Sequence, residues 1–217
     1  MWRPADKIAR ILRRRVGDQG TLRVVVPDFA KSAGTLLALG ADIIVMSDSS
    51  ELGPIDPQII SRDAEDRPVQ RPAHTYVDAY DALAAKISDP RSYEGGKNAD
   101  AEKQLLKSFD PAHLNLCRQL IVRSRQLAEA LLKQGMLQDG TYTKVAGDLT
   151  DNDRWHSDHG AVIDSQDAQA MGLHVEPLNP NSGLWQAYWR LYCEQRLALV
   201  DGVRKLFESD YASLPFS

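Results

Sequence analysis

Residues 21–58 read TLRVVVPDFAKSAGTLLALGADIIVMSDSSELGPIDPQ, and this stretch decides the fold class. The β-branched run at 24–26 predicts a strand, the apolar segment 35–40 predicts a buried helix, and the run at 43–46 predicts a second strand. Strands that are apolar along their whole length are typical of parallel sheets covered on both faces. The stretch therefore predicts a βαβ unit in an α/β protein.

The flanking sequence extends this prediction in both directions. An amphipathic helix is expected over residues 4–15, ended by the glycines between 17 and 20. An α/β protein normally places a strand before such a first helix, and no strand is predicted there. We expect either that the fold starts late or that an N-terminal portion with this strand has been lost. Further along, we expect helices over 74–86, 111–134, 165–171 and 182–208, a short strand over 161–163, and loops over 47–73 and 135–153.

Composition and charge narrow the class of protein. The hydrophobic and charged fractions, 43% and 26%, are those of an ordinary globular protein. The formal net charge is -4, so we expect no nucleic-acid partner. The basic run Arg13–Arg14–Arg15 closes the first helix, where cations suit the C-terminal end of the helix dipole. No apolar stretch approaches 18 residues and the first residues form no signal peptide, so we expect no membrane segment and a cytoplasmic location.

The two cysteines, Cys117 and Cys193, lie far apart in predicted helices. Their separation matches no metal-ligand spacing, and it favours two reduced thiols. We therefore expect neither a disulfide nor a metal or other cofactor bound through cysteine.

Ser32 is the strongest candidate for chemistry, because it stands between a predicted strand and a predicted buried helix. The backbone N–H groups and the dipole at a helix N-terminus favour developing negative charge, which suits a nucleophile. The alternative is that Lys31–Ser32–Ala33–Gly34 is only a small-residue turn that allows close packing of helix on strand. A serine hydroxyl also needs a base, itself oriented by a third group.

Histidines supply the candidates for that base. His156 and His159 flank an aspartate immediately before the predicted strand at 161–163, whereas His74, His113 and His174 lie near predicted helix ends and read as surface or capping residues. The spacing of His156 and His159 also allows a metal site, but no nearby Cys or His completes a zinc set.

Asp56 stands in the loop Gly-Pro-Ile-Asp-Pro, where two prolines fix the backbone and hence the direction of the carboxylate. It is a candidate for the group that orients a base. The alternative is a turn residue whose side chain bonds to its own loop.

Two motifs resemble a known family. The string AKSAGTLLALGADIIVMSDSSELGPIDPQI at 30–59 resembles the core motif of the serine dehydrogenase proteinase family, which is related to the Clp protease proteolytic subunit and signal peptide peptidase A. HGAVIDSQDAQAMGL at 159–173 resembles the closing strand and short helix of that family. The resemblance spans roughly residues 4–178. It implies a ClpP/crotonase-like fold, in which a parallel sheet is flanked by helices.

The resemblance also implies a Ser-Asp-His triad. Ser32 matches the nucleophile, Asp56 matches the aspartate and His159 matches the histidine, with His156 as a competitor. A variant within the class pairs the serine with a lysine, for which Lys31 and Lys86 are candidates. Relatives carry a Gly-Gly pair before the first helix that builds the oxyanion hole, and this chain has Met-Trp-Arg-Pro at that place.

The sequence thus predicts a serine protease domain at 1–178, N-terminally truncated, and a helical extension at 179–217. The expected activity is hydrolysis of a peptide or protein substrate through an acyl-enzyme on Ser32, without a cofactor. A catalytically silent homologue that serves as an assembly subunit is the main alternative, and a crotonase-type acyl-CoA enzyme is a weaker one. The resemblance implies a homo-oligomer, and it leaves open whether an ATPase partner feeds it.

Overall fold

The computed structural model describes residues 3–17, 19–62, 65–89, 91–93, 99–155, 160–199, 205–209 and 212–216. The helices are α1 (Arg3–Val16), α2 (Ala33–Leu39), α3 (Ala73–Ser88), α4 (Asp100–Lys107), α5 (Pro111–Gln134), α6 (Tyr142–Leu149), α7 (Asn152–Trp155), α8 (Ser165–Ala170) and α9 (Gly183–Ala198). The strands are β1 (Arg23–Val25), β2 (Phe29–Ala30), β3 (Ile43–Met46), β4 (Glu51–Leu52), β5 (Gln58–Arg62), β6 (Pro68–Pro72), β7 (Val175–Pro177), β8 (Lys205–Ser209) and β9 (Ala212–Phe216).

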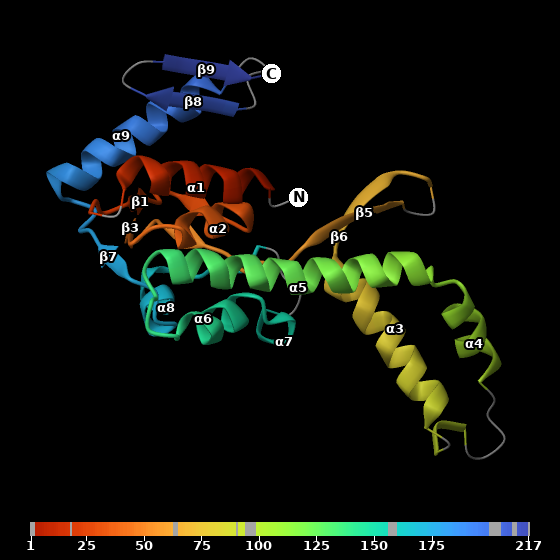
Figure 1. Ribbon diagram of the computed structural model, residues 1–217. Helices are drawn as coiled ribbons and strands as arrows, with labels where there is room; N and C mark the ends of the chain where they lie inside the picture. The colour runs from red at the N-terminus through yellow and green to blue at the C-terminus, as the bar shows by residue number, and fades with distance from the viewer. Residues whose placement is uncertain are drawn as a thin grey trace.

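A parallel sheet forms the centre of the fold. Its strand order is β1-β3-β7, with Val24 beside Ile44 and Ile44 beside Val175. The middle strand is almost wholly buried, which explains its continuous apolar sequence. In Figure 1, α1 and α2 lie on one side of the long helix α5, and α6, α7 and α8 lie on the other. The expected α/β class with a parallel sheet and flanking helices is confirmed.

Helix α1 is fixed to the βαβ unit by Arg13. Its guanidinium donates to both carboxylate oxygens of Asp42 (3.0 and 2.8 Å) and to the carbonyl oxygen of Gly40 (2.8 Å). The backbone N–H of Leu22 donates to the same carboxylate at 2.7 Å. Burial alone would raise the pKa of Asp42, but the hydrogen bonds from Arg13 and Leu22 and the charge of Arg13 together lower it. Arg13 therefore has a structural partner within the fold.

The expected loop at 47–73 contains an antiparallel hairpin instead, formed by β5 and β6. This stretch contains four prolines, at 54, 57, 68 and 72, and proline limits regular structure. Two of them, Pro68 and Pro72, are the first and last residues of β6, and a strand in a two-stranded ribbon tolerates proline there because one of its edges faces away from the partner. The prediction of a loop was wrong for these residues.

Three more helical segments differ from the sequence predictions. The loop expected at 135–153 contains α6 and the first half of α7, and α4 was not predicted. These helices are short, so each carries too few apolar positions to give a clear period. Tertiary packing accounts for α6, since Val145, Ala146 and Leu149 are buried in the main core.

The last long helix ends earlier than expected. It was predicted over 182–208, but α9 ends at Ala198, and β8 and β9 then form an antiparallel pair. The predicted C-terminal extension is therefore only partly helical. Tyr192 ties α9 to the rest of the fold by donating to Asp28 at 2.5 Å. Burial and the bond to Asp28 raise the pKa of Tyr192 to about 12. Within the part of the chain that the structure describes, no helix is long and apolar enough to cross a membrane.

Candidate functional site

Ser32 occupies a sharp, strained turn between β2 and α2. Its backbone has φ 51° and ψ -103°, a region that residues with a Cβ rarely adopt. Its side chain makes no capping hydrogen bond to the N–H groups of α2. The turn is also tight, since a Cβ on Gly34 would lie 3.1 Å from the Cβ of Ala30. Strain of this kind persists only where the surrounding structure enforces it, and it is concentrated at functional sites.

Thr35 joins the first turn of α2 to two neighbouring segments. Its buried hydroxyl lies 2.7 Å from the carbonyl oxygen of Ala30 and 2.8 Å from that of Gly53, and it accepts from the N–H of Gly53 at 3.1 Å. Gly53 lies in the loop that leads to Asp56. The helix that begins at Ser32 is therefore fixed to the loop that carries Asp56.

Asp56 is a buried carboxylate, 8% exposed. Gln58, at the start of β5, donates from Nε2 to its Oδ2 at 2.5 Å. The loop before Asp56 is held by a hydrogen bond from the N–H of Ile55 to the carbonyl of Leu149 (2.8 Å). A small cavity lies beside Asp56 and is also lined by Trp155. The carboxylate is thus held in one place.

The segments around Ser32, Asp56 and Ile163 leave the same edge of a small strand cluster. β2 and β4 run parallel with Ala30 beside Leu52, so their C-terminal ends, which lead to Ser32 and Asp56, share an edge. Ile163 pairs with Leu52 in the antiparallel sense, through hydrogen bonds of 2.9 and 3.1 Å. The residues just before Ile163 therefore lie at that edge as well. The segments that carry Ser32 and Asp56 therefore converge with the described residues just before Ile163.

Lys31 crosses this edge and joins all three segments. Its Nζ donates to the carbonyl oxygens of Leu52 (3.1 Å) and Ala161 (3.0 Å), and it forms an ion pair with Glu51 at 2.8 Å. Its stem packs over Gly53, where a Cβ would come within 2.6 Å of the Lys31 Cδ. The ammonium of Lys31 therefore acts as a clamp between the serine turn, β4 and the segment before Ile163.

These contacts give no support to a Ser/Lys dyad. The Lys31 ammonium is engaged by two carbonyls and a carboxylate. Lys86, on α3, is bound to Glu102 at 2.5 Å, and this hydrogen bond raises the pKa of Lys86. A lysine that acts as a general base needs a lowered pKa.

His159 and its competitor His156 lie outside the described residues. The residues on either side of this segment are described. Trp155 lines the same cavity as Asp56, and Ala161 accepts from Lys31, the neighbour of Ser32. The assignment of either histidine as the base stays a prediction.

His74 is a further imidazole near Asp56 that the sequence gave no reason to select. It lies at the start of α3 and is half-buried, and its Nε2 has no hydrogen-bond partner among the described residues. Burial lowers the pKa of His74, although the charges of Asp78, Asp56, Asp151 and Asp153 oppose this change. Among the described residues, an imidazole with a lowered pKa therefore lies close to Asp56 and is contributed by another part of the molecule.

The remaining histidines and the cysteines lie elsewhere. His174 belongs to the approach to β7, where its carbonyl accepts from the N–H of Ile44, and His113 packs edge-on against Tyr76. Cys117 and Cys193 are both free thiols, as expected, and burial raises the pKa of Cys117. Among the described residues, no group of three His, Cys, Asp or Glu side chains could hold a metal ion.

Comparisons with known proteins agree with the class of site. Residues 3–90 match the family model described as ClpP-like SDH-type serine proteinase, so the family resemblance noted in the sequence is confirmed over these residues, and the motif at 159–173 lies outside the match. This match covers the Ser32 turn and the Asp56 loop. No solved structure matches the chain, and the ClpP/crotonase fold stays a prediction in its details.

Two curated relatives are uncharacterized proteins of Methanocaldococcus jannaschii. MJ0137 is 28% identical over 172 residues, which is 79% of this chain and 48% of the relative. MJ1495 is 39% identical over 66 residues, which is 30% of this chain and 20% of the relative. The chain thus matches about half or less of the length of these relatives.

Proposed function

We propose that the protein is a serine peptidase that hydrolyses peptide bonds through an acyl-enzyme on Ser32. Asp56 and His159 complete the triad, in the chain order Ser-Asp-His. The family match over residues 3–90 supports a serine peptidase, and the roles of Ser32 and Asp56 rest on their positions within it. The role of His159 rests on the resemblance of the motif at 159–173 to the family's closing strand.

The observation that carries this proposal is the strained backbone of Ser32 at the edge where three segments converge. A serine whose only role is to cap the N-terminus of a helix normally accepts a hydrogen bond from the helix N–H groups with its hydroxyl and adopts extended backbone angles. Ser32 does neither. A nucleophilic serine on a sharp strand-to-helix turn exposes its hydroxyl in this way. The buried Asp56, fixed by Gln58, supplies the orienting carboxylate.

The chemistry follows from these positions. The imidazole of His159 accepts the proton of the Ser32 hydroxyl as Oγ attacks the peptide carbonyl carbon. Asp56 holds the imidazole in the correct tautomer and stabilises the imidazolium. The tetrahedral intermediate collapses with transfer of that proton to the leaving amine, and the acyl group stays on Oγ. A water molecule then attacks the ester carbonyl while the imidazole accepts its proton. The second tetrahedral intermediate collapses as the imidazolium returns that proton to Oγ, which breaks the ester bond and releases the acid.

One donor to the oxyanion is available at the turn itself. The N–H of Ala33 is the first of α2, and the first N–H groups of a helix have no acceptor within that helix. An amide at this position, next to the nucleophile, stabilises the negative oxygen of the intermediate. The positive end of the α2 dipole adds to this effect.

The family resemblance also supports assembly into a homo-oligomer. Large apolar side chains on α9 are exposed, and they offer contact area for a second copy: Leu184, Leu191 and Leu197. Light scattering coupled to size-exclusion chromatography measures the mass of the assembly, and a mass of about 24 kDa, that of one chain, would contradict it.

A fluorophosphonate probe tests the proposed activity. We expect covalent labelling of the 217-residue chain at Ser32, located by peptide mass spectrometry. The Ser32→Ala variant should not label, whereas Ser88→Ala, a control at the end of α3, should label normally. Absence of labelling at Ser32, while a known serine peptidase labels in the same reaction, would reject the proposal and favour a silent assembly subunit.

A further inference from the structure

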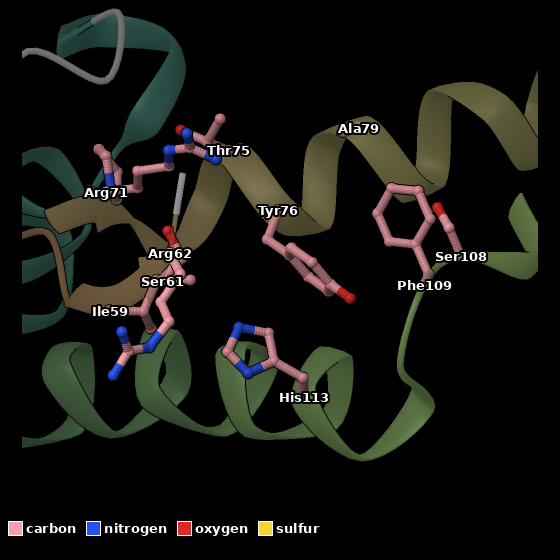
Figure 2. A pocket seen from close by; sticks show the side chains of 11 residues that line it. Ile59, Ser61, Arg62, Arg71, Thr75, Tyr76, Ala79, Ser108, Phe109 and His113 are labelled. Atoms are coloured by element: carbon pink, nitrogen blue, oxygen red, sulfur yellow. The ribbon is translucent and has the colours of Figure 1, made fainter. Parts of the chain in front are cut away.

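A second cavity lies between the β5–β6 hairpin, α3 and the beginning of α5. Its volume is about 570 Å³. Figure 2 shows side chains from all three elements directed towards it, with Arg71 at one side and Phe109 at the other. We call it the arginine pocket, and it is lined by Ile59, Ser61, Arg62, Arg71, Pro72, Thr75, Tyr76, Ala79, Ser108, Phe109 and His113.

The charged side chains of this pocket are all of one sign. Arg62 and Arg71 line it, His113 adds an imidazole, and no aspartate or glutamate is among the lining residues. The whole chain is acidic, with 30 Asp and Glu against 26 Lys and Arg. Arg62 is already bound to Asp66, at 2.7 Å to its carbonyl and 3.0 Å to its carboxylate. Arg71 is exposed and is the principal cation of the pocket.

One wall of the pocket is aromatic and held in place. The ring of Tyr76 lies 4.9 Å from that of Phe109 and 4.7 Å from that of His113. The Tyr76 hydroxyl accepts from the backbone N–H of Asp110 at 3.0 Å, which fixes the ring between α3 and α5. A ligand that fits this pocket therefore combines an anionic group with an apolar body.

Strand β5 joins the arginine pocket to the proposed active site. β5 begins at Gln58, whose amide binds Asp56, and the next residue, Ile59, lines the pocket. Ile59 and Ser61 project from the same face of β5, and Arg71 lies opposite Ile59 on β6. A peptide bound at Ser32 that extends along β5 would reach the pocket with its neighbouring residues.

We propose that the arginine pocket binds a peptide through a carboxylate and an adjacent apolar side chain. The guanidinium of Arg71 binds the carboxylate, and the rings of Tyr76 and Phe109 contact the apolar group. The assignment of a peptide as the ligand rests on the proposed function, whereas the preference for an anion with an apolar body rests on the pocket itself. The carboxylate can belong to an acidic side chain or to a free C-terminus.

Isothermal titration calorimetry on the Ser32→Ala chain tests this, because binding is then measured without turnover. Three peptides are compared: acetyl-AAAAF with a free C-terminus, acetyl-AAAAF amide, and acetyl-AAEAF amide. At least one carboxylate peptide should bind about five- to tenfold more tightly than the neutral amide, as expected for hydrogen bonds to a charged group. The free C-terminus and the glutamate peptide distinguish the two sources of the carboxylate.

Arg71→Gln should remove this advantage and leave the affinity for the neutral peptide unchanged. Arg67→Gln removes the same charge from the same hairpin but outside the pocket, so it should keep the advantage. Equal binding of all three peptides, an advantage that survives in Arg71→Gln, or an equal loss in Arg67→Gln would overturn the proposal. Fluorophosphonate labelling of the chain with Ser32 intact is a separate measurement, so a pocket that binds and a serine that does not label would reject only the peptidase.

Discussion

The region around Ser32 and the arm that carries the arginine pocket are built differently. We call the β5–β6 hairpin, α3, α4 and the first turns of α5 the arm, which projects to one side in Figure 1. The main core contains fully buried side chains such as Leu36, Leu39 and Ile44, from α2 and β3. The buried cluster of the arm is small: Ile59, Ala73, Val77, Leu114 and Cys117.

This difference explains what each region can do. The strained backbone of Ser32 needs a rigid surrounding, and a densely packed core beneath α2 supplies it. The arm has little core of its own, so its elements can shift with smaller loss of packing. The proposed nucleophile thus lies on a rigid part of the molecule, and the proposed binding pocket lies on a more adaptable part. This arrangement suits an enzyme that binds extended substrates.

The largest expected effect tests which region supplies the base. His159→Ala should slow fluorophosphonate labelling of Ser32 by about 1,000-fold or more, because the serine then lacks its general base. His74→Ala, in the arm, should change the rate by less than about tenfold, since the Nε2 atom of that imidazole has no hydrogen-bond partner among the described residues. The same labelling rate measured on His156→Ala shows whether His156, and not His159, is the base.

A large loss in His74→Ala with normal labelling in His159→Ala would move the base to the arm. The proposed triad would then be Ser32, Asp56 and His74, and the division between the two regions would no longer hold. Thermal unfolding of each variant, followed by circular dichroism, controls for loss of the fold.

The second effect compares the two cores by the same substitution. Leu36→Ala should lower the free energy of unfolding by about 3–4 kcal/mol, because the side chain is fully buried and the cavity cannot collapse easily. Leu114→Ala, 7% exposed in the arm cluster, should cost about 2 kcal/mol. Leu197→Ala, 72% exposed, should cost less than about 0.5 kcal/mol. Urea unfolding measures all three, and equal losses at Leu36 and Leu114 would contradict the difference in packing.

The sequence predicted best those elements with a clear apolar pattern, in both regions. In the arm, α3 was expected over 74–86 and spans Ala73–Ser88. β1, β3 and α2 follow from continuous apolar runs, and the long helix α5 was predicted with the bounds that the structure has, Pro111–Gln134. The helix expected over 165–171 is α8, and Asp164 caps it by accepting from the N–H groups of Gln166 and Asp167. In these segments local preference and tertiary packing agree.

The β5–β6 hairpin and the supports of the site could not be predicted in the same way. The prolines at 68 and 72 made the β5–β6 hairpin look like a loop in the sequence. Proline has no N–H to donate, so it is excluded only from strand positions whose N–H must bond to the partner strand. The clamp by Lys31 joins residues 130 positions apart, and no local pattern marks such a contact. Gln58 is different: it lies two positions after Asp56, and its role could have been suspected from an amide so close to a candidate carboxylate.

A third, smaller effect concerns the two lysines. Lys31→Met should lower kcat for a peptide substrate by about 10- to 100-fold with little change in KM, because it releases the segments that carry the proposed triad without touching the substrate. Lys86→Met, in the exposed ion pair of the arm, should leave both constants unchanged.

A merely structural role of Lys31 would give a lower Tm but a normal kcat below that temperature. The shape of the pH–rate profile separates the two cases further. If Lys31 positions the histidine segment against Asp56, its loss should shift the acidic limb of the profile, which a uniform loss of folded protein would not do. An unchanged kcat in Lys31→Met would reject the clamp as a positioning device.

The smallest effect compares one ion pair from each region across pH. The folded pKa of Asp42 is lowered, so its contribution to stability is present above the unfolded value of about 3.8 and is lost as pH falls through the folded pKa. Asp42→Asn should therefore cost about 1 kcal/mol of unfolding free energy near neutral pH, and the cost should shrink below about pH 4. Asp81→Asn removes the exposed partner of Arg118 in the arm and should cost less than about 0.5 kcal/mol at either pH. If Asp42→Asn and Asp81→Asn lower the free energy of unfolding equally across this pH range, the Arg13–Asp42 pair does not attach α1 to the fold. Apolar packing against α2 would then account for its attachment.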